Sequence, residues 1–406
     1  MDLKRLIRLL KTSPWLAPVL AGIDALLWLT DRLAVLLAGR VTVRKGSLAV
    51  LRFDVLGDYL AFRTYLRYLK TQAAYRDQHL TLVGNQAFRG LAETLDADVV
   101  DAFVWVDIYK LSTRPAYRFG VVRRLRRLGV ETAFCPTYSR VLVLDDFMAR
   151  ATGAPVRVGC VSDGINLNRW EMAWGNRQYT RLLTTQPGYV FELTRNQQIM
   201  AAFLQQHVPT LPPTIDPAAL PTVALPDRAI VLSLGAGQAF RVWPAERFAA
   251  VVRHLRTHHP SHPILLTGAP GEEPYAAALL TLLPDPSVVQ DCTGHLSLRA
   301  LMAVLHRAAL LIANETGTVH LAAALGTPTV VVSQGKSLVR WHPYPPALAP
   351  QVRHVYPPYV EQHRADLTVI APQFNPESPL SITDVSVERV LEQVDRVFAG
   401  GTRLHA

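Results

Sequence analysis

The stretch from residue 310 to 335, LLIANETGTVHLAAALGTPTVVVSQG, constrains the fold more than any other part of the chain. A short apolar run is followed by a polar break, an apolar segment of helical length, a Gly-Thr-Pro turn and a second apolar run. Continuous apolar runs are typical of strands that are covered on both faces, and a helix between two such strands makes them parallel. The stretch therefore predicts one βαβ unit of a parallel α/β sheet.

The turn before the predicted helix has the chemistry of an anion site. We expect Thr318 to cap the helix and Gly326 to end it in a left-handed conformation. Thr316, Gly317 and Thr318 offer hydroxyl and backbone N–H groups, and His320 adds a further donor. Because the helix dipole favours negative charge at this end, the turn is suited to a phosphate group. A capped helix with a core-facing histidine is the alternative that the spacing leaves open.

Length and charge narrow the class of protein. The chain has 406 residues, enough for two or three domains, and its net charge of +10 points to an anionic partner. The basic run at residues 123–127 lacks interleaved aromatic residues, so we expect no nucleic-acid partner. The three cysteines are far apart and predict neither a disulfide framework nor a zinc site.

Two α/β halves flank a proline-rich segment. Strand and helix patterns alternate over residues 46–208 and again over residues 227–382. Between them, residues 209–226 hold six prolines in eighteen positions, which predicts an exposed linker. Residues 383–406 are expected to form a final amphipathic helix and tail, and residues 344–358 a proline-rich loop.

The first 45 residues have a composition of their own. Eight lysines and arginines against three aspartates give this segment a charge of +5, mixed with leucine and tryptophan. Asp24 and Asp31 lie on one helical stripe and argue against a bilayer-spanning helix, because each charge would cost about 2.5–3.5 kcal/mol at the centre. We expect helices that lie on an anionic membrane surface. A helical hairpin packed on the protein's own core is the alternative.

Several polar residues lie at predicted strand ends. Asp58 follows Gly57 at a strand-to-helix turn, where parallel sheets bind ligands, although an aspartate there also caps a helix. Gly235 and Gly237 form an incomplete dinucleotide fingerprint. Arg241, at the mouth of the next helix, is suited to neutralise a phosphate, with a simple surface cation as the alternative.

The metal-like patterns are incomplete. Asp96 and Asp98 lie in a polar turn, where such residues usually serve the turn itself. His258, His259 and His262 have a metal-like composition, but loop histidines at this spacing are usually solvated. We therefore expect neither a metal nor a cofactor.

Taken together, these segments resemble glycosyltransferase family 9, the ADP-heptose–lipopolysaccharide heptosyltransferases. The resemblance covers residues 47–341 and is weak over residues 77–226. Four segments carry it in the family's order: LRFDVLGDYL (51–60), LGAGQAFRVWPAERF (234–248), GAPGEE (268–273) and DCTGHLSLRALMAVLHRAALLIANETGTVHLAAALGTP (291–328).

The resemblance implies a GT-B fold, in which two Rossmann-like domains face each other across a cleft. Residues 46–208 would bind the acceptor and residues 227–382 the nucleotide-sugar. It implies an inverting, metal-independent transfer of a sugar, expected to be heptose from an ADP-sugar, to a lipopolysaccharide core or related lipid-linked glycan. The enzyme would be cytoplasmic and peripheral on the inner membrane. The alternatives are a non-catalytic nucleotide-sugar-binding scaffold of the same fold, or a GT-B sugar-nucleotide epimerase.

The resemblance also implies roles for single residues. On the acceptor side, next to Gly57, Asp58 matches the proposed general base, and Arg241 matches a usual lysine that steadies the departing diphosphate. Glu315 stands where heptosyltransferases commonly have aspartate, and Glu272 and Leu296 would lie near the ribose and base. The implied donor-binding residues are Gly235, Gly237, Arg241, Glu272, Leu296, Glu315, Thr316, Gly317, Thr318 and His320.

Overall fold

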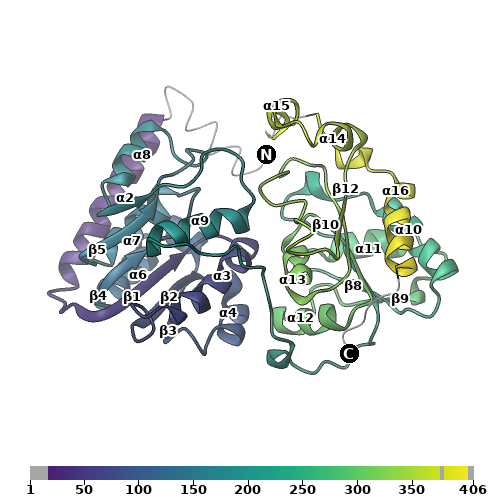
Figure 1. Cartoon of the computed structure of the whole chain (residues 1–406), viewed down its shortest axis with the longest axis horizontal. Coiled ribbons are helices and arrows are strands. Elements are labelled where there is room, and N and C mark those ends of the chain that lie inside the picture. Colours follow the sequence, from purple (N-terminus) through teal and green to yellow (C-terminus); the bar gives the residue numbers. More distant parts are fainter. Residues whose placement is uncertain (1–16, 375–378, 401–406) are drawn as a thin grey trace. The chain divides into compact units, whose positions relative to one another are not determined.

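The computed structural model describes residues 17–374 and 379–400 of the chain. These residues form two compact α/β units, each built on one parallel sheet (Figure 1). The first unit comprises residues 17–59, 65–188 and 194–210, and the second comprises the remaining described residues.

The sheet of the first unit has six parallel strands in the order β3-β2-β1-β4-β5-β6. Leu48 in the central strand pairs with Leu80 on one side and with Thr132 on the other. The order reverses between β1 and β4, as in a doubly wound Rossmann sheet. The strands are β1 (Arg44–Arg52), β2 (His79–Asn85), β3 (Ala102–Val106), β4 (Val130–Phe134), β5 (Val156–Cys160) and β6 (Arg181–Leu183).

Helices cover the strands of this sheet and close its core. Ala49 and Leu51 of β1 belong to a buried apolar cluster with Val122 and Leu125 of α6. The helices before, between and after the strands are α2 (Ala17–Leu37), α3 (Leu56–Thr71), α4 (Arg89–Leu95), α5 (Ile108–Thr113), α6 (Pro115–Arg127), α7 (Phe147–Ala151), α8 (Arg169–Asn176) and α9 (Glu192–Leu204).

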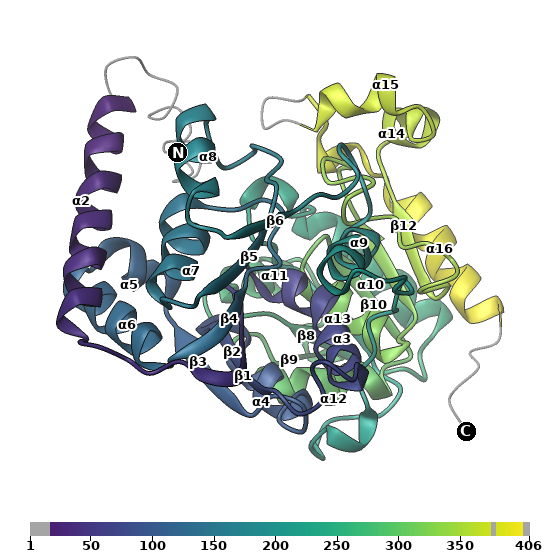
Figure 2. The same cartoon turned by 60° about the vertical axis from the view of Figure 1, so that its left-hand side comes forward.

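The α2 helix packs along α6 and α7 at the margin of the first unit (Figures 1 and 2). Ala34 is buried in the core, and Trp28 and Val35 pack against it. Arg118 of α6 donates two hydrogen bonds of 2.8 and 2.6 Å to the carboxylate of Asp31, and both side chains are buried. Asp31 therefore faces the protein, as the packed alternative for this segment predicts. The basic helix expected at residues 3–11 lies outside the described residues.

The opposite face of α2 is apolar and open to solvent. Arg32 lies at the edge of this face. Among the described residues, no helix combines the length and the apolar character that crossing a membrane requires. The seven apolar residues of the outward face, between 49% and 72% exposed, are Val19, Ile23, Leu26, Leu29, Leu33, Leu36 and Leu37.

The second unit repeats the same topology, with the strand order β12-β11-β10-β7-β8-β9. Leu311 pairs with Thr329 of β11 and with Val231 of β7, so the predicted parallel βαβ unit is confirmed. The strand order reverses between β7 and β10. The strands are β7 (Ile230–Ser233), β8 (Ile264–Thr267), β9 (Val289–Asp291), β10 (Leu310–Asn314), β11 (Thr329–Val332) and β12 (Val352–Val355).

The helices of the second unit cover a core around the buried Trp243. The C-terminal helix α16 contributes Val390 and Val394 to this core and packs against α10. The helices are α10 (Ala245–His258), α11 (Glu273–Thr281), α12 (Leu298–Arg307), α13 (Gly317–Leu325), α14 (Pro358–His363), α15 (Leu367–Ile370) and α16 (Val387–Ala399).

Three local predictions are wrong. Helix α3 begins at Leu56, so Gly57 and Asp58 lie in its first turn and not in the turn before it. Thr316, not Thr318, occupies the N-cap of α13, because the helix already begins at Gly317. The segment expected to be a proline-rich loop at residues 344–358 contains β12.

Candidate functional site

The predicted donor-binding residues follow the carboxyl ends of the second unit's parallel strands. Gly235 follows β7, Glu272 follows β8, and Leu296 follows β9 just before Ser297, which caps α12. Glu315 comes directly after β10. Open α/β sheets bind ligands at this edge, where the strand order reverses, and here the reversal lies between β7 and β10.

Glu315 is the centre of a polar cluster at this edge. Its Oε2 lies 2.9 Å from Nε2 of His342 and accepts a 2.7 Å hydrogen bond from Oγ of Ser333. Its Oε1 lies 3.4 Å from Nη1 of Arg241. Burial opposes ionisation, but His342, Arg241 and Ser333 together hold the pKa of Glu315 well below its usual range. The carboxylate is therefore charged at neutral pH.

His342 connects this carboxylate to a buried phenol. Its Nδ1 lies 2.9 Å from the hydroxyl of Tyr356, and both side chains are buried. Burial and the nearby Glu315 raise the pKa of Tyr356 well above its usual value, so the phenol keeps its proton. Because the Glu315 carboxylate only accepts, Nε2–H of His342 donates to it. Sequence reasoning missed Ser333, His342 and Tyr356, because the last two lie far from the motifs in the chain.

Arg241 lies in a short 3-10 turn before α10. Its Nη2 donates a 3.4 Å hydrogen bond to Oγ of Ser337, while its Nε is buried and has no hydrogen-bond partner among the described residues. Lys336 lies nearby, with Nζ 5.0 Å from the centroid of the Phe240 ring. Burial, and then the charge of Arg241, lower the pKa of Lys336. Two cations thus approach one point, which suits a diphosphate, and sequence reasoning missed Lys336.

The first turn of α13 supplies hydrogen-bond donors. Thr316 has an extended backbone at the N-cap, and its hydroxyl makes no capping hydrogen bond. The N–H groups of Gly317 and Thr318 lie in the first turn, where a helix offers them no acceptor. The structure therefore keeps the backbone donors of the predicted anion turn, although the N-cap lies two residues earlier than expected.

His320 adds a neutral donor to this turn. Its Nδ1 lies 2.6 Å from the hydroxyl of Tyr344. Burial lowers the pKa of His320 to about 4, against the opposing effect of the Glu315 carboxylate, and burial raises the pKa of Tyr344. Tyr344 therefore keeps its proton and donates it to Nδ1, which leaves the proton of His320 on Nε2.

Gly235 and Glu272 are in close contact. A Cβ on Gly235 would lie 2.0–2.2 Å from the carboxyl atoms of Glu272, so a larger residue there would displace that carboxyl group. Glu272 accepts a 2.9 Å hydrogen bond from the N–H of Ala269. A Cβ on Gly237, in contrast, would meet no atom within 4 Å. The loops after β7 and β8 thus bring two of the predicted donor residues together.

In the first unit, Asp58 lies at the corresponding strand end. Its Oδ2 accepts a 3.4 Å hydrogen bond from the N–H of Val55, which is the N-cap residue. Asp58 therefore helps to cap α3 from the third helical position and is not itself the N-cap that the alternative predicts. The buried Arg52 holds the surrounding loops, since it donates to the carbonyl groups of Pro136 at 2.7 Å and of Asp58 at 2.9 Å. Arg52 also pairs with Asp54 at 2.8 Å. The half-buried Asp58 therefore lies just after β1, beside the reversal of the strand order between β1 and β4.

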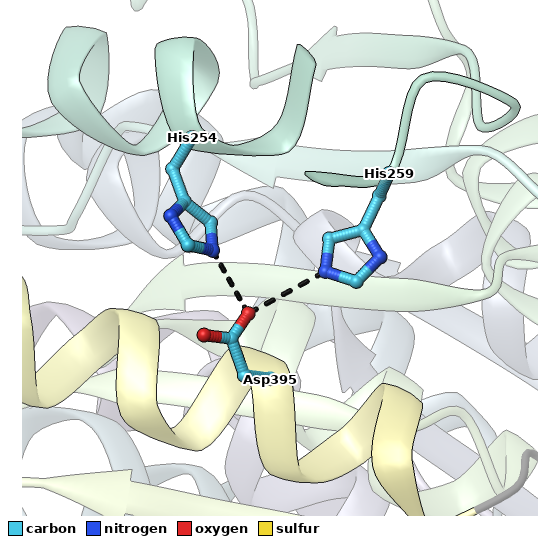
Figure 3. Close-up of side chains that lie close together, drawn as sticks. All are labelled: His254, His259 and Asp395. Carbon is cyan, nitrogen blue, oxygen red and sulfur yellow. Dashed lines mark hydrogen bonds and ion pairs between the residues drawn. The ribbon is translucent and has the colours of Figure 1, made fainter. Parts of the chain in front are cut away.

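The metal-like patterns have different fates. Asp96 is buried and accepts a 2.7 Å hydrogen bond from the hydroxyl of Tyr59, and Asp98 pairs with Arg67. This pair thus serves the protein's own structure. Of the three histidines in the sequence pattern, His259 lies beside Asp395, together with His254 from outside the pattern (Figure 3).

The other two histidines of the pattern lie elsewhere. His258 stacks on His254 with a centroid distance of 4.1 Å. Nδ1 of His262 lies 2.7 Å from the carbonyl oxygen of Arg228. Sequence reasoning missed His254, one helical turn before His258, and Asp395, which is distant in the chain.

The family model described as glycosyltransferase family 9 (heptosyltransferase) matches residues 177–367. This confirms the predicted resemblance for most of the second unit and leaves residues 51–60, with Asp58, outside the matched range. A search of curated protein sequences finds no match.

Solved structures of this family share the fold. The glycosyl transferase family 9 protein from Veillonella parvula DSM 2008 aligns with a TM-score of 0.65 and 15% identity, over 87% of this chain and 97% of that chain. E. coli heptosyltransferase WaaC with ADP-2-deoxy-2-fluoro heptose aligns with a TM-score of 0.63 and 16% identity, over 86% of this chain and 99% of that chain. E. coli ADP-heptose lps heptosyltransferase II aligns with a TM-score of 0.59 and 16% identity, over 87% of this chain and 99% of that chain. The predicted GT-B fold class is confirmed, and the two comparisons together support a glycosyltransferase.

Proposed function

We propose that the chain is a nucleotide-sugar glycosyltransferase that moves a heptose from an ADP-sugar to a lipopolysaccharide core or a related lipid-linked glycan. The observation that carries the proposal is that Arg241 and Lys336 both lie beside the Phe240 ring, and that Arg241 pairs with Glu315 two residues before α13, at the switch point of the second sheet. This arrangement suits a nucleotide diphosphate, and the family match covers it.

The leaving diphosphate sets the main electrostatic demand. As the bond between the anomeric carbon and the phosphate oxygen breaks, its electron pair stays on the diphosphate, which gains negative charge. The guanidinium of Arg241 and the ammonium of Lys336 counter that charge, and backbone N–H groups of Gly317 and Thr318 add donors. His320 contributes Nε2–H as a neutral donor. These groups supply the charge compensation of a metal-independent transfer.

Asp58 is the proposed general base. It takes the proton of the acceptor hydroxyl while that oxygen attacks the anomeric carbon from the face opposite the diphosphate, which inverts the configuration. The capping bond from Val55 keeps one carboxylate oxygen oriented. Glu315 acts through Arg241, whose guanidinium it holds, and is a positioning residue.

We also propose that the protein is cytoplasmic and peripheral on the inner membrane, where a lipid-linked acceptor resides. The support is the outward apolar face of α2, because seven large apolar side chains are exposed on one helix. Tethering on the same surface would raise the effective concentration of a membrane-bound acceptor.

The direct test is transfer by the full-length protein, with ADP-heptose and a soluble core acceptor, with and without a chelator. We expect release of ADP and a glycosylated product, unchanged by the chelator. Donor binding without transfer to any core acceptor would favour the scaffold alternative. Conversion of the donor in the absence of acceptor would favour the epimerase.

A further inference from the structure

A cavity of about 220 Å³ in the first unit has an uncompensated positive lining. It lies between α2, α6 and α7 and reaches the start of β5, far along the chain from every residue assigned to the donor site. Asp31 is the one carboxylate of its lining, and Arg118 already pairs with it. The side chains that matter for binding are Trp28, Arg32, Arg126, Phe147, Arg150 and Arg157.

Four arginines line the cavity: Arg32, Arg126, Arg150 and Arg157. Within the described part of the chain, none of them forms an ion pair with a carboxylate. Arg126 has a buried Nε without a hydrogen-bond partner among the described residues. A Cβ on Gly153 would overlap the guanidinium of Arg126, so this glycine makes room for the cation. Burial, and then repulsion from Arg150, lower the pKa of Arg157.

Two of the guanidinium groups make uncharged contacts. Arg157 donates a 2.6 Å hydrogen bond to the carbonyl oxygen of Gln178. Arg32 lies 5.5 Å from the centroid of the Trp28 ring. Gathering like charges in a partly enclosed space costs free energy, which an anion with several acceptor oxygens offsets. A phosphate group fits this chemistry best, because each guanidinium can donate two parallel hydrogen bonds to it.

We propose that this cavity binds the phosphate group of an anionic membrane lipid. The proposal rests on the proposed membrane association. Arg32 lies on α2 between the cavity and the outward apolar face. Leu29 is three positions before it, Leu33 is the next residue, and Leu36 is four positions after it. A lipid whose acyl chains contact that face can therefore place its phosphate among the arginines. The positive lining selects an anionic headgroup, and the apolar face selects a lipid over a soluble phosphate compound.

The test compares vesicle binding by two variants with the same loss of charge. In Arg126→Gln/Arg150→Gln the cavity is changed, and in Arg124→Gln/Arg127→Gln two exposed arginines of α6 are changed. With phosphatidylcholine vesicles containing phosphatidylglycerol, we expect the cavity variant to bind at least about tenfold more weakly than the control variant, as the loss of charged hydrogen bonds predicts. Equal losses would mean general surface attraction and would overturn the proposal.

Inorganic phosphate separates this proposal from the membrane proposal. If the wild type ignores all vesicles, the membrane association fails. If phosphate then raises the melting temperature of the wild type but not of the cavity variant, the cavity binds a soluble phosphate compound, and the lipid assignment is overturned. No phosphate effect and no preference for anionic vesicles would exclude the site altogether. A melting temperature of the cavity variant at or above that of the wild type in plain buffer confirms that it folds.

A second and independent site lies where the C-terminal helix meets α10. Figure 3 shows His254 and His259 pointing at one oxygen of Asp395. The distances from Nε2 to Oδ1 of Asp395 are 2.8 Å for His254 and 3.4 Å for His259, and the three ligand atoms lie within 4.8 Å of one another.

Packing holds both rings in this arrangement. His259 stacks on Phe398 with a centroid distance of 4.0 Å, and His254 stacks on His258 at 4.1 Å. Burial opposes ionisation of Asp395, but hydrogen bonds to both histidines lower its pKa, so it is an anionic ligand at neutral pH. The carboxyl side chain is 51% exposed, which leaves a path for an ion.

We propose that His254, His259 and Asp395 bind a divalent transition metal, with zinc as the natural occupant of two imidazoles and one carboxylate. Water would complete the coordination. The ion would replace the proton shared between His254 and Asp395 and would clamp α16 onto α10. Its role is structural, because none of the three residues belongs to the donor site.

Zinc titration of the full chain, monitored by calorimetry and by melting temperature, tests this site. We expect one zinc per chain and a higher melting temperature, both lost in Asp395→Asn and His259→Phe. Glu392→Gln, an exposed carboxylate on the same helix, is the matched control and should bind as the wild type does. Zinc binding that persists in Asp395→Asn, or is lost equally in His262→Ala, would mean adventitious binding to surface histidines.

Discussion

Arg241 and Glu315 form an ion pair, with Nη1 of the guanidinium 3.4 Å from Oε1 of the carboxylate. These are the two positions at which the chain departs from the family pattern that its motifs resemble. The structure shows that the departures meet. Glu315 is longer than the usual aspartate, and its carboxylate reaches the guanidinium of Arg241, which replaces the usual lysine. His342 and Ser333 contact the other oxygen of the same carboxylate. The pair therefore orients the cation proposed to steady the diphosphate.

Arg241→Ala is expected to lower kcat by about 10²–10³ and to weaken donor binding, because a fixed cation opposite the leaving diphosphate is lost. Arg241→Lys keeps the charge, and we expect it to be largely tolerated. Steady-state kinetics with varied donor will separate the two effects. Arg253→Ala removes an exposed arginine of α10 and is the control. Activity that depends strictly on Mg²⁺ would contradict this role of Arg241.

The pair should also be visible as an energetic coupling. Glu315→Gln leaves the guanidinium and His342 without their anion, and we expect unfolding free energy to fall by about 1–3 kcal/mol. In Arg241→Ala/Glu315→Gln the combined loss should be smaller than the two single losses added together, by about 0.5–3 kcal/mol. Denaturant unfolding of the three variants measures this. Strict additivity would mean that the two side chains do not interact.

His320 should make the fold sensitive to mild acid. Its pKa is about 4 in the folded state, below that of an ordinary histidine near 6.5, so between these values the unfolded chain binds a proton that the folded chain does not. The stability is therefore fully present above pH 6.5 and is lost as the pH falls towards 4. We expect a smaller drop in melting temperature from pH 7 to pH 5 in His320→Gln than in the wild type. His295→Gln, at an exposed histidine, should behave as the wild type, and an equal drop in His320→Gln would refute the assignment.

Asp58→Asn is expected to reduce transfer by about 10²–10⁴ and to leave donor affinity nearly unchanged, because an amide does not act as the base. The amide oxygen can still accept the hydrogen bond from Val55, so α3 should remain capped and the melting temperature close to that of the wild type. Single-turnover rates and donor binding are the measurements. Asp98→Asn, at an exposed carboxylate of the same unit, is the control. Near-normal turnover of Asp58→Asn would reduce Asp58 to its capping role.

The outward face of α2 offers a sharper test of membrane contact than removal of the first 45 residues. Removal would also take away Asp31 and Ala34, which are buried in the first unit. Leu26→Gln/Leu33→Gln changes exposed positions only, and we expect it to weaken vesicle binding while the melting temperature stays unchanged. Ile165→Gln, at an exposed apolar residue elsewhere, is the control. A full-length protein that ignores anionic vesicles at low salt would exclude this contact.

The central strands and the helices beside them could be predicted from the sequence. The βαβ unit around residues 310–332 lies where the apolar runs predict it, because buried parallel strands are continuous in apolar residues. The edge strand β12 was missed. Only the first and last residues of β12 are buried, and Arg353 between them is exposed, so the strand lacks a continuous apolar run.

The sequence also placed most of the donor-side residues at strand ends, because strand, turn and helix are local patterns. It did not place His342, Tyr356 or Lys336 beside them. Those contacts depend on the register of β10 against β11 and on the segment that follows β11, which brings His342 onto Glu315 and Tyr356 onto His342.

The two faces of α2 show the same division. Its sequence is apolar nearly all round, so periodicity alone allowed a membrane-surface helix and a packed helix equally. The tertiary structure decided that Asp31 faces Arg118 of α6, because a buried carboxylate needs a buried cation and only the folded chain brings the two together. What the sequence determined was the chemistry of each segment. What covers each face depends on contacts between residues far apart in the chain, and no local pattern encodes them.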